Sequence, residues 1–332
     1  ILKFHAADTK PDALLDADLK RLAFVNEHGV FTNKEKLYES ALKEMETRYA
    51  GNASVAQAMY LRAVNLRARG TQYNPFTGKD KQFDIKKAKE ICDEAIAKYP
   101  GSEGAINCHN LLAEINNQFL NLETEKVNVP GMPFRTLVKY KNVSTLYLRV
   151  IKTTRTKLKK LERNDDYNRQ WALMADINPE KEWNVSLPNQ QDYQQHSAEI
   201  KIDELPAGTY IILASVNANF KPVKNYLARQ ITYVSNIAYI TNNKNELYIL
   251  DRSSGLPLAN ADVQLWQQNY DYNSRNYDDI KKEKYKSDKN GYVKMTRSRE
   301  NYYNQYIQVN YGKDELFTDD SYYNYYYDAN QP

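Results

Sequence analysis

The chain has 332 residues, of which 42% are hydrophobic, and its 46 lysines and arginines against 42 aspartates and glutamates give a net charge of +4. That length exceeds what one hydrophobic core usually serves, so we expect two or three domains. The charge is small and its signs are interspersed, which argues against nucleic-acid binding, and no apolar run approaches the about 20 residues of a membrane helix. The sequence starts at Ile1 rather than Met and shows no charged n-region followed by an apolar h-region, so we interpret it as a mature or trimmed chain from which any export signal has been removed.

Residues 1–122 have the periodicity of amphipathic helices. One apolar stripe comprises Leu37, Tyr38, Ala41, Leu42, Met45 and Tyr49, and a second comprises Val55, Ala56, Met59, Tyr60, Ala63 and Leu66. The arrangement recurs about fifty residues later, at Ile91, Cys92, Ala95, Tyr99, Ile106, Leu111, Leu112, Ile115 and Phe119. Leu15, Leu19 and Leu22 add one helix upstream. We therefore predict a helical domain of repeated helix pairs.

These helix pairs, with the strings YAGN at 49–52 and YPGS at 99–102, resemble tetratricopeptide-like repeats whose extra length lies in residues 71–83. Stacked pairs of this kind can form a concave groove for a peptide, as in an assembly scaffold. Only two clear pairs are present, and a solenoid usually needs three or more. A packing and spacer domain is therefore the favoured interpretation, and a scaffold that binds a protein partner through residues 1–122 is an alternative.

After residue 121 the apolar pattern changes to the period of two that is typical of strands. Two extended runs within residues 133–151 are separated only by Lys141 and Asn142, so we predict that they pair as an antiparallel hairpin. Candidate strands of residues 123–234 are 126–129, 134–140, 145–151, 198–203, 210–216 and 226–234. This number of short strands predicts a β-sandwich.

Residues 152–182 form a long polar insertion, for which we expect a contact role and a short helix near 171–175. Its basic start, residues 152–160, is expected to be a solvated loop face because no aromatic platform accompanies it.

Residues 235–332 predict a second β-sandwich, with a C-terminal part that is an incomplete linker. Its candidate strands are 237–241, 246–251, 261–266, 283–287, 292–296 and 306–311. Asn290-Gly291 is the strongest hairpin signal, since both central residues of a type I′ turn need positive φ. Asp288 could begin a calcium loop, but the later carboxylate ligands are missing and a turn is favoured. The predicted class is thus α+β multidomain, a helical domain followed by two tandem antiparallel β-sandwiches.

Several strings on these strands resemble the N-terminal macroglobulin domains of bacterial alpha-2-macroglobulin-like proteins. They are FR at 134–135, NVSTLYLRV at 142–150, LPAGTY at 205–210, LYILD at 247–251 and SGLPLANA at 254–261. The most diagnostic is Asp-x-x-Ser-Gly-x-Pro-Leu-x-x-Ala-x-Val at 251–263, together with Gly291-Tyr292-Val293. The resemblance covers about residues 124–315, and the Lys-, Asn- and Tyr-rich composition looks like that of a Bacteroidetes envelope protein.

The resemblance implies an exported protein of the bacterial periplasm or cell surface that inhibits endopeptidases by trapping them. This chain would be its N-terminal, non-catalytic part, with proteases and downstream macroglobulin domains as partners. The family's reactive thioester needs Cys-x-Glu-Gln, whereas Cys92-Asp93-Glu94 is followed by Ala95, so this chain is expected to carry none. The helical first third lies outside the pattern of the animal family members.

Neither the cysteines nor the histidines form a recognisable site. Cys92 and Cys108 lie on apolar helix faces, where two buried free thiols are favoured over a disulfide between adjacent helices. His5, His28, His109 and His196 stand isolated, so no metal site is expected. The carboxylate pairs Asp165-Asp166, Asp278-Asp279 and Asp319-Asp320 lie in polar segments that we interpret as solvated turns. We expect no enzymatic activity, no catalytic residue and no cofactor.

Tyrosines crowd the C-terminal end. Tyr302, Tyr303, Tyr306 and Tyr311 are followed by Tyr322, Tyr323, Tyr325, Tyr326 and Tyr327. Tyrosine combines a large apolar ring with a polar tip, so the last five are candidate partner-binding residues. They support the alternative function of a cell-envelope adhesion or glycan-binding module, whereas an edge strand or linker is the structural explanation.

Overall fold

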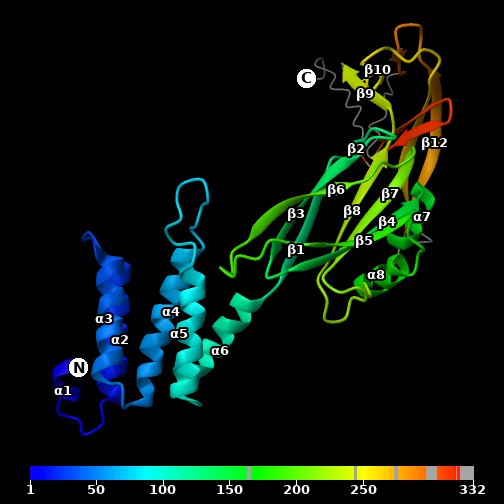
Figure 1. Ribbon diagram of the computed structural model, residues 1–332. Helices are drawn as coiled ribbons and strands as arrows, with labels where there is room; N and C mark the ends of the chain where they lie inside the picture. The colour runs from blue at the N-terminus through cyan, green and yellow to red at the C-terminus, as the bar shows by residue number, and fades with distance from the viewer. Residues whose placement is uncertain (163–165, 243–244, 273–275, 297–304, 319, 322–332) are drawn as a thin grey trace, which may run out of the picture. The chain divides into compact units, whose positions relative to one another are not determined.

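The computed structural model describes residues 1–162, 166–242, 245–272, 276–296, 305–318 and 320–321. The protein is an α+β multidomain chain in which helices come first and sheets follow (Figure 1). It divides into two compact units. The helical unit comprises Ile1–Phe119, Tyr140–Ser144 and Pro188–His196, and the sandwich unit comprises the remaining described residues. No helix in the described part of the chain is long and apolar enough to cross a membrane.

The helical unit contains the predicted helices α2 (Asp12–His28), α3 (Lys34–Arg48), α4 (Ala56–Gly70), α5 (Asp84–Lys98) and α6 (Glu103–Asn116). It also contains two short helices that the periodicity does not predict, α1 (Leu2–His5) and η1 (Ala53–Val55). Figure 1 shows α2 to α6 side by side, from blue to cyan. Three expected core positions are wrong: Leu37, Ile106 and Phe119 are 57%, 55% and 41% exposed. Leu37 and Ile106 lie at the margin of the apolar stripe of their helix, and Phe119 lies beyond the end of α6.

Helix α6 of the second pair packs so closely against α4 of the first pair that no side chain fits between the two backbones at Gly104. A Cβ atom at Gly104 of α6 would lie 2.1 Å from the backbone carbon of Ala56 in α4. Ser102 caps the same helix end, its hydroxyl accepting from the backbone N–H of Ala105 at 3.2 Å. Cys92 of α5 and Cys108 of α6 are both buried free thiols, as predicted.

The loop between strands β5 and β6 belongs to the helical unit and forms a buried polar network at the end of α4 and just before the start of α5. Gln194 donates from Nε2 to the carbonyls of Gly70 and Gln82, at 3.0 and 3.1 Å. Gln82 in turn donates to the carboxylate of Asp192, which is 1% exposed. Buried polar groups are costly unless paired, so this network fixes the loop on the helices.

The first sandwich contains two sheets with the orders β1-β3-β6 and β2-β8-β7-β4-β5. The strands are β1 (Phe119–Thr124), β2 (Val127–Asn128), β3 (Phe134–Lys141), β4 (Thr145–Thr153), β5 (Lys181–Ser186), β6 (His196–Ile202), β7 (Gly208–Ser215) and β8 (Leu227–Val234). The pairings of β4, β7 and β8 are antiparallel, whereas the two-residue β2 runs parallel to β8.

The predicted hairpin of residues 133–151 is wrong, because β3 and β4 lie in different sheets. Strand β4 pairs with β5 on one side and β7 on the other, which leaves no edge for β3. Asn142 sits between them at a φ of 55°, and its Nδ2 donates to the carbonyl of Ile115 at 2.8 Å. The short polar break therefore carries the chain from one sheet to the other.

The polar insertion is more ordered than the sequence suggests. It contains α7 (Arg155–Glu162), α8 (Tyr167–Ala175) and the start of β5. Leu158, Trp171 and Met174 are buried with Ile151, Ile211 and Leu213 in one cluster. The two helices thus cover the outer face of the five-stranded sheet, beside β4 and β7 in Figure 1.

The second sandwich has the sheets β13-β10-β9 and β12-β11-β14-β15. The strands are β9 (Ile237–Asn242), β10 (Glu246–Asp251), β11 (Asp262–Asp271), β12 (Asn276–Lys286), β13 (Tyr292–Lys294), β14 (Gln305–Tyr311) and β15 (Asp314–Phe317). Its core combines residues of both sheets, including Ile249 and Val293 from one and Val263, Ile307 and Leu316 from the other.

The Asn290-Gly291 turn differs from the predicted type I′ hairpin. Of its two central residues only Gly291 has positive φ, at 72°. The amide of Gly291 donates to the carbonyl of Asp288 at 3.0 Å, and the amide of Asp288 donates to the carbonyl of Tyr292 at 2.9 Å. This is a type I turn followed by a left-handed glycine. It leads the chain from β12 in one sheet to β13 in the other.

Candidate functional site

A charged cluster joins helix α7 to the outer face of the second sandwich. Nε of Arg155 donates to Oδ2 of Asp279 at 2.9 Å, and Nζ of Lys159 forms an ion pair with Oδ1 of the same carboxylate. The side chains of Arg155 and Asp279 are only 18% and 13% exposed. We call these three residues the α7 latch. The predicted solvated turn at Asp278-Asp279 and the predicted solvated face at 152–160 are therefore both wrong at the latch residues.

Aromatic rings surround the latch arginine. The guanidinium of Arg155 lies 4.7 Å from the ring centre of Tyr306 and 4.2 Å from that of Phe317. Phe317 stacks on Trp266 with centroids 5.5 Å apart, and Nζ of Lys281 lies 5.3 Å from the Trp266 ring. Cations attract the faces of aromatic rings, so the stack holds α7 on the sheet in addition to the ion pairs.

Strand register explains why these side chains share one face. Trp266 of β11 pairs with Lys281 of β12 and with Tyr306 of β14. Val263 and Leu265, on the opposite face of β11, are buried in the core. The alternation of a strand thus turns Trp266, Tyr306 and their neighbours outward, where α7 meets them.

The latch carboxyl is charged at neutral pH. Burial alone would raise the pKa of Asp279, but the hydrogen bonds and positive charges of Arg155 and Lys159 outweigh it and hold this pKa below its usual 3.8. A buried charge that loses its partners is strongly destabilising. Removal of one latch residue is therefore expected to destabilise the contact between α7 and the second sandwich.

A groove of about 580 Å³ lies beside the latch, between α7 and the strands β11, β12, β14 and β15; we call it the α7 groove. Two hydrogen bonds fix part of its wall: Nε1 of Trp266 donates to Oε1 of Gln308 at 2.7 Å, and Nε2 of Gln308 donates to Oε2 of Glu315 at 2.7 Å. Tyr277, half exposed, lies at another point of the wall.

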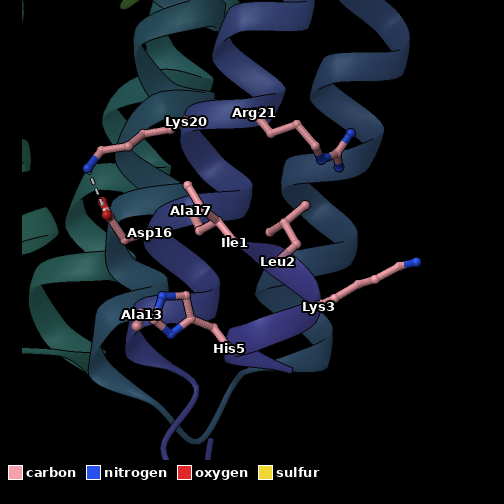
Figure 2. Close-up of a pocket in the computed structure, with 9 residues that line it drawn as sticks. All are labelled: Ile1, Leu2, Lys3, His5, Ala13, Asp16, Ala17, Lys20 and Arg21. Atoms are coloured by element: carbon pink, nitrogen blue, oxygen red, sulfur yellow. Dashed lines mark hydrogen bonds and ion pairs between the residues drawn. The ribbon is translucent and has the colours of Figure 1, made fainter. Parts of the chain in front are cut away.

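A second hollow, of about 770 Å³, lies in the helical unit between α1 and α2 (Figure 2). Ala13 and Ala17 line it together with basic side chains such as Lys3 and Arg21. Asp16 pairs with Lys20 at 2.7 Å, the dashed line in Figure 2, and His5 pairs with Asp8 at 2.7 Å. Both are exposed contacts between residues three or four positions apart.

Other histidine and aspartate side chains that could take part in catalysis or metal binding have structural roles. His196, which the sequence leaves isolated, lies 2.8 Å from the Asp192 carboxylate in the buried network. Asp166 caps α8, and Asp320 pairs with Lys126 at 2.5 Å. Within the described ranges, no three histidine, cysteine or acidic side chains are placed so that they could hold a metal ion.

The predicted partner-binding residues Tyr322, Tyr323, Tyr325, Tyr326 and Tyr327 lie outside the described residues, as do Tyr302 and Tyr303. Of the described tyrosines in that segment, Tyr306 packs under Arg155, and Tyr311 is 43% exposed. Sequence analysis missed the latch residues entirely. Arg155 and Asp279 are 124 positions apart, and nothing local to either one signals the other.

The 251–263 motif closes a loop at the end of β10. Oδ1 of Asp251 accepts from the backbone N–H and the hydroxyl of Ser254, both at 2.8 Å, and these bonds lower the pKa of the carboxyl. Gly255 has a φ of 71°, which favours glycine. The amide of Leu258 then donates to the carbonyl of Ile249 at 2.9 Å. The motif residues therefore shape the second sandwich.

No family model matches the chain, and no curated protein matches it in sequence. Among solved structures, a crystal structure of native alpha-2-macroglobulin from Escherichia coli spanning domains MG0-NIE-MG1 matches with 12% identity and a TM-score of 0.44, over 61% of this chain and 64% of that one. A fragment spanning NIE-MG1 matches with 13% identity and a TM-score of 0.40, over 61% of this chain and 97% of that one. The native E. coli protein seen by cryo-EM matches with 11% identity and a TM-score of 0.25, over 58% and 15%.

Proposed function

We propose that the chain is a non-catalytic segment of a bacterial alpha-2-macroglobulin-like endopeptidase inhibitor, in which it forms part of a shell that traps proteases. The observation that carries the proposal is the 251–263 motif, whose Asp251, Ser254 and Gly255 close a loop in the second of two tandem sandwiches. The other strings of the resemblance fall on strands of both sandwiches, as tandem macroglobulin domains would require.

The α7 latch supports a mechanical role. A wall that excludes large substrates must keep its domains in a fixed arrangement, and a buried ion cluster gives such an arrangement specificity. The helical unit would space or dock this wall. The inhibitor would be exported to the periplasm or cell surface, with proteases and downstream macroglobulin domains of the same polypeptide as partners.

The test is a trapping assay with the full-length protein. A protease is mixed with it, and cleavage of a large protein substrate is compared with cleavage of a small peptide substrate. A shell should suppress cleavage of the large substrate alone, because the small one still diffuses in. Unchanged cleavage of both substrates across several protease classes would overturn the proposal, and equal loss of both would indicate an active-site inhibitor instead.

Paired variants connect the assay to this chain. Arg155→Ala should weaken protection of the large substrate by loosening the latch, whereas Arg135→Ala removes an exposed ion pair with Glu199 and should leave protection intact. Equal protection of the large substrate by both variants would show that the latch plays no part in trapping.

A further inference from the structure

The α7 groove retains polar and aromatic groups that the latch does not use. Its volume of about 580 Å³ falls within the about 300–1,000 Å³ that is usual for small-molecule sites. The latch closes one part of it through Asp279, while Tyr277, Asp278 and Glu315 line other parts.

Tyr277 offers an aromatic surface. Its side chain is 50% exposed, and its ring meets Tyr270 of the paired strand edge to face, with centroids 5.0 Å apart. The two tyrosines are direct cross-strand partners in the β11–β12 pair, which fixes the ring's position. Trp266, by contrast, stacks on Phe317, and Lys281 lies over its ring, so Trp266 forms part of the groove wall.

The polar groups of the wall are held in place before any ligand arrives. Gln308 is fixed at both ends of its amide, by Trp266 and by Glu315. Thr154 and Thr156 line the opposite wall at the start of α7. Hydroxyl, amide and carboxylate groups together supply both donors and acceptors, and fixing them in advance lowers the entropy cost of binding.

The charged side chains that line the groove are of both signs. Arg155, Lys159 and Lys160 are positive, and Asp279 and Glu315 are negative. A strongly charged ligand would face groups of its own sign in this space, whereas a neutral one would not. Charge complementarity therefore favours a neutral polar ligand.

We propose that the α7 groove binds a neutral oligosaccharide. Sugar rings present hydroxyls that donate and accept, which suits Gln308 and Glu315, and C–H faces that pack on an aromatic ring such as Tyr277. A peptide strand would need the backbone of a sheet edge or deep apolar pockets, whereas outward side chains of the sheet line this groove.

The test uses the whole 332-residue chain and isothermal titration calorimetry, with neutral hexasaccharides of β-1,4-linked glucose, α-linked mannose and β-1,4-linked N-acetylglucosamine as probes. At least one probe should bind. Tyr277→Ala should weaken that binding by about tenfold or more, as truncation of an aromatic hot spot does. Tyr311→Ala, a change of equal size at a 43% exposed tyrosine of the same sheet outside the groove, should leave it unchanged.

The proposal would be overturned if no probe binds, or if both variants bind the sugar as tightly as the parent chain does. It would also be overturned if an unfolded peptide displaces the sugar and binds with the same affinity to the Tyr277→Ala variant. Far-UV circular dichroism of each variant excludes a loss through misfolding. Binding of a sulfated polysaccharide alone, weakening as salt rises, would assign the groove to anions and also contradict it. The result is independent of protease trapping, so either proposal can fail without the other.

Discussion

The helical unit and the sandwich unit each bury a carboxylate against basic side chains, but over very different distances in the chain. In the helical unit Asp84, 5% exposed, accepts from Arg69 only 15 positions away, at 2.6 Å. In the sandwich unit Asp279 accepts from Arg155, 124 positions away. The first contact strengthens a helix pair that apolar stripes already build. The second joins helix α7 to strand β12 of the second sandwich, a contact in addition to that of Tyr233 of β8, which packs into the core of that sandwich.

The largest loss of stability is expected in the helical unit, at Gly104. Gly104→Ala would place a Cβ atom 2.1 Å from the Ala56 backbone, and we expect a loss of about 3 kcal/mol or more in the free energy of unfolding. Gly51→Ala is the matched control, because no atom lies within 4 Å of its added Cβ and its φ is not left-handed. That control should be neutral or stabilise by about 0.4–1 kcal/mol.

Far-UV circular dichroism follows the helical unit in this experiment, and fluorescence follows the other, since Trp171, Trp183 and Trp266 all belong to the sandwich unit. Gly104→Ala should shift the first signal and leave the second unchanged. If both glycine variants behave alike, the close crossing of α4 and α6 does not limit stability.

The next effect concerns the latch. Arg155→Ala leaves a buried carboxylate with one basic partner fewer and removes the contacts with Tyr306 and Phe317, so we expect a loss of about 3 kcal/mol. Arg135→Ala breaks an ion pair whose side chains are 74% and 57% exposed, and such pairs contribute about 0–1 kcal/mol. Denaturant unfolding followed by tryptophan fluorescence measures both. Equal midpoints for the two variants would show that the latch adds nothing to stability.

Acid should weaken both units. The pKa values of Asp84 and Asp279 lie below 3.8 in the folded chain, because Arg69, and in the latch Arg155, outweigh the effect of burial. A carboxyl whose folded pKa is lowered stabilises the protein above the unfolded pKa, and that stability is lost as pH falls through the folded pKa. Urea midpoints should therefore be level near neutral pH and fall below pH 3.8.

Asp279→Asn sharpens this test, since the variant has no latch carboxyl to protonate. Its fluorescence transition should start lower and depend less on pH in the acid range. An acid response as steep as that of the parent chain would place the titrating groups elsewhere.

The smallest effect is expected where the two helix pairs meet. The hydroxyl of Tyr99 donates to the carbonyl of Ala50 at 2.7 Å, so Tyr99→Phe should cost about 1 kcal/mol. Tyr49→Phe, at the corresponding position of the first pair, is the control and should cost less. Thermal unfolding followed by far-UV circular dichroism compares the stability of the two variants. A larger loss of stability in Tyr49→Phe than in Tyr99→Phe would contradict a special role for the Tyr99 hydrogen bond.

Periodicity predicted the elements well where neighbours along the chain decide the structure. Leu42 and Met45 recur at helical spacing and are buried, and the alternation of Ile200 and Ile202 marks β6. Pairing between strands was not predictable in the same way. Strands β3 and β4 are separated by a short break that suggests a hairpin. Both edges of β4 pair instead with β5 and β7, which come later in the chain.

The candidate site was beyond sequence analysis for the same reason. Asp279 stands in a polar run that resembles a solvated turn until strand pairing places it on the face that meets α7. Strands β1, β5 and β15 were missed because each is short or of mixed polarity, and its burial depends on distant strands. The 251–263 motif could be found because its turn is local.

We claim that the α7 latch helps to hold the two sandwiches as one body. Spin labels on Lys201→Cys in the first sandwich and Lys289→Cys in the second, both at exposed positions, allow their separation to be measured by pulsed electron paramagnetic resonance. The native thiols Cys92 and Cys108 are buried and should stay unlabelled. We predict one narrow distance distribution that broadens in Arg155→Ala and stays narrow in Arg135→Ala. A broad distribution in the otherwise unchanged chain, or one that Arg155→Ala does not alter, would contradict the claim.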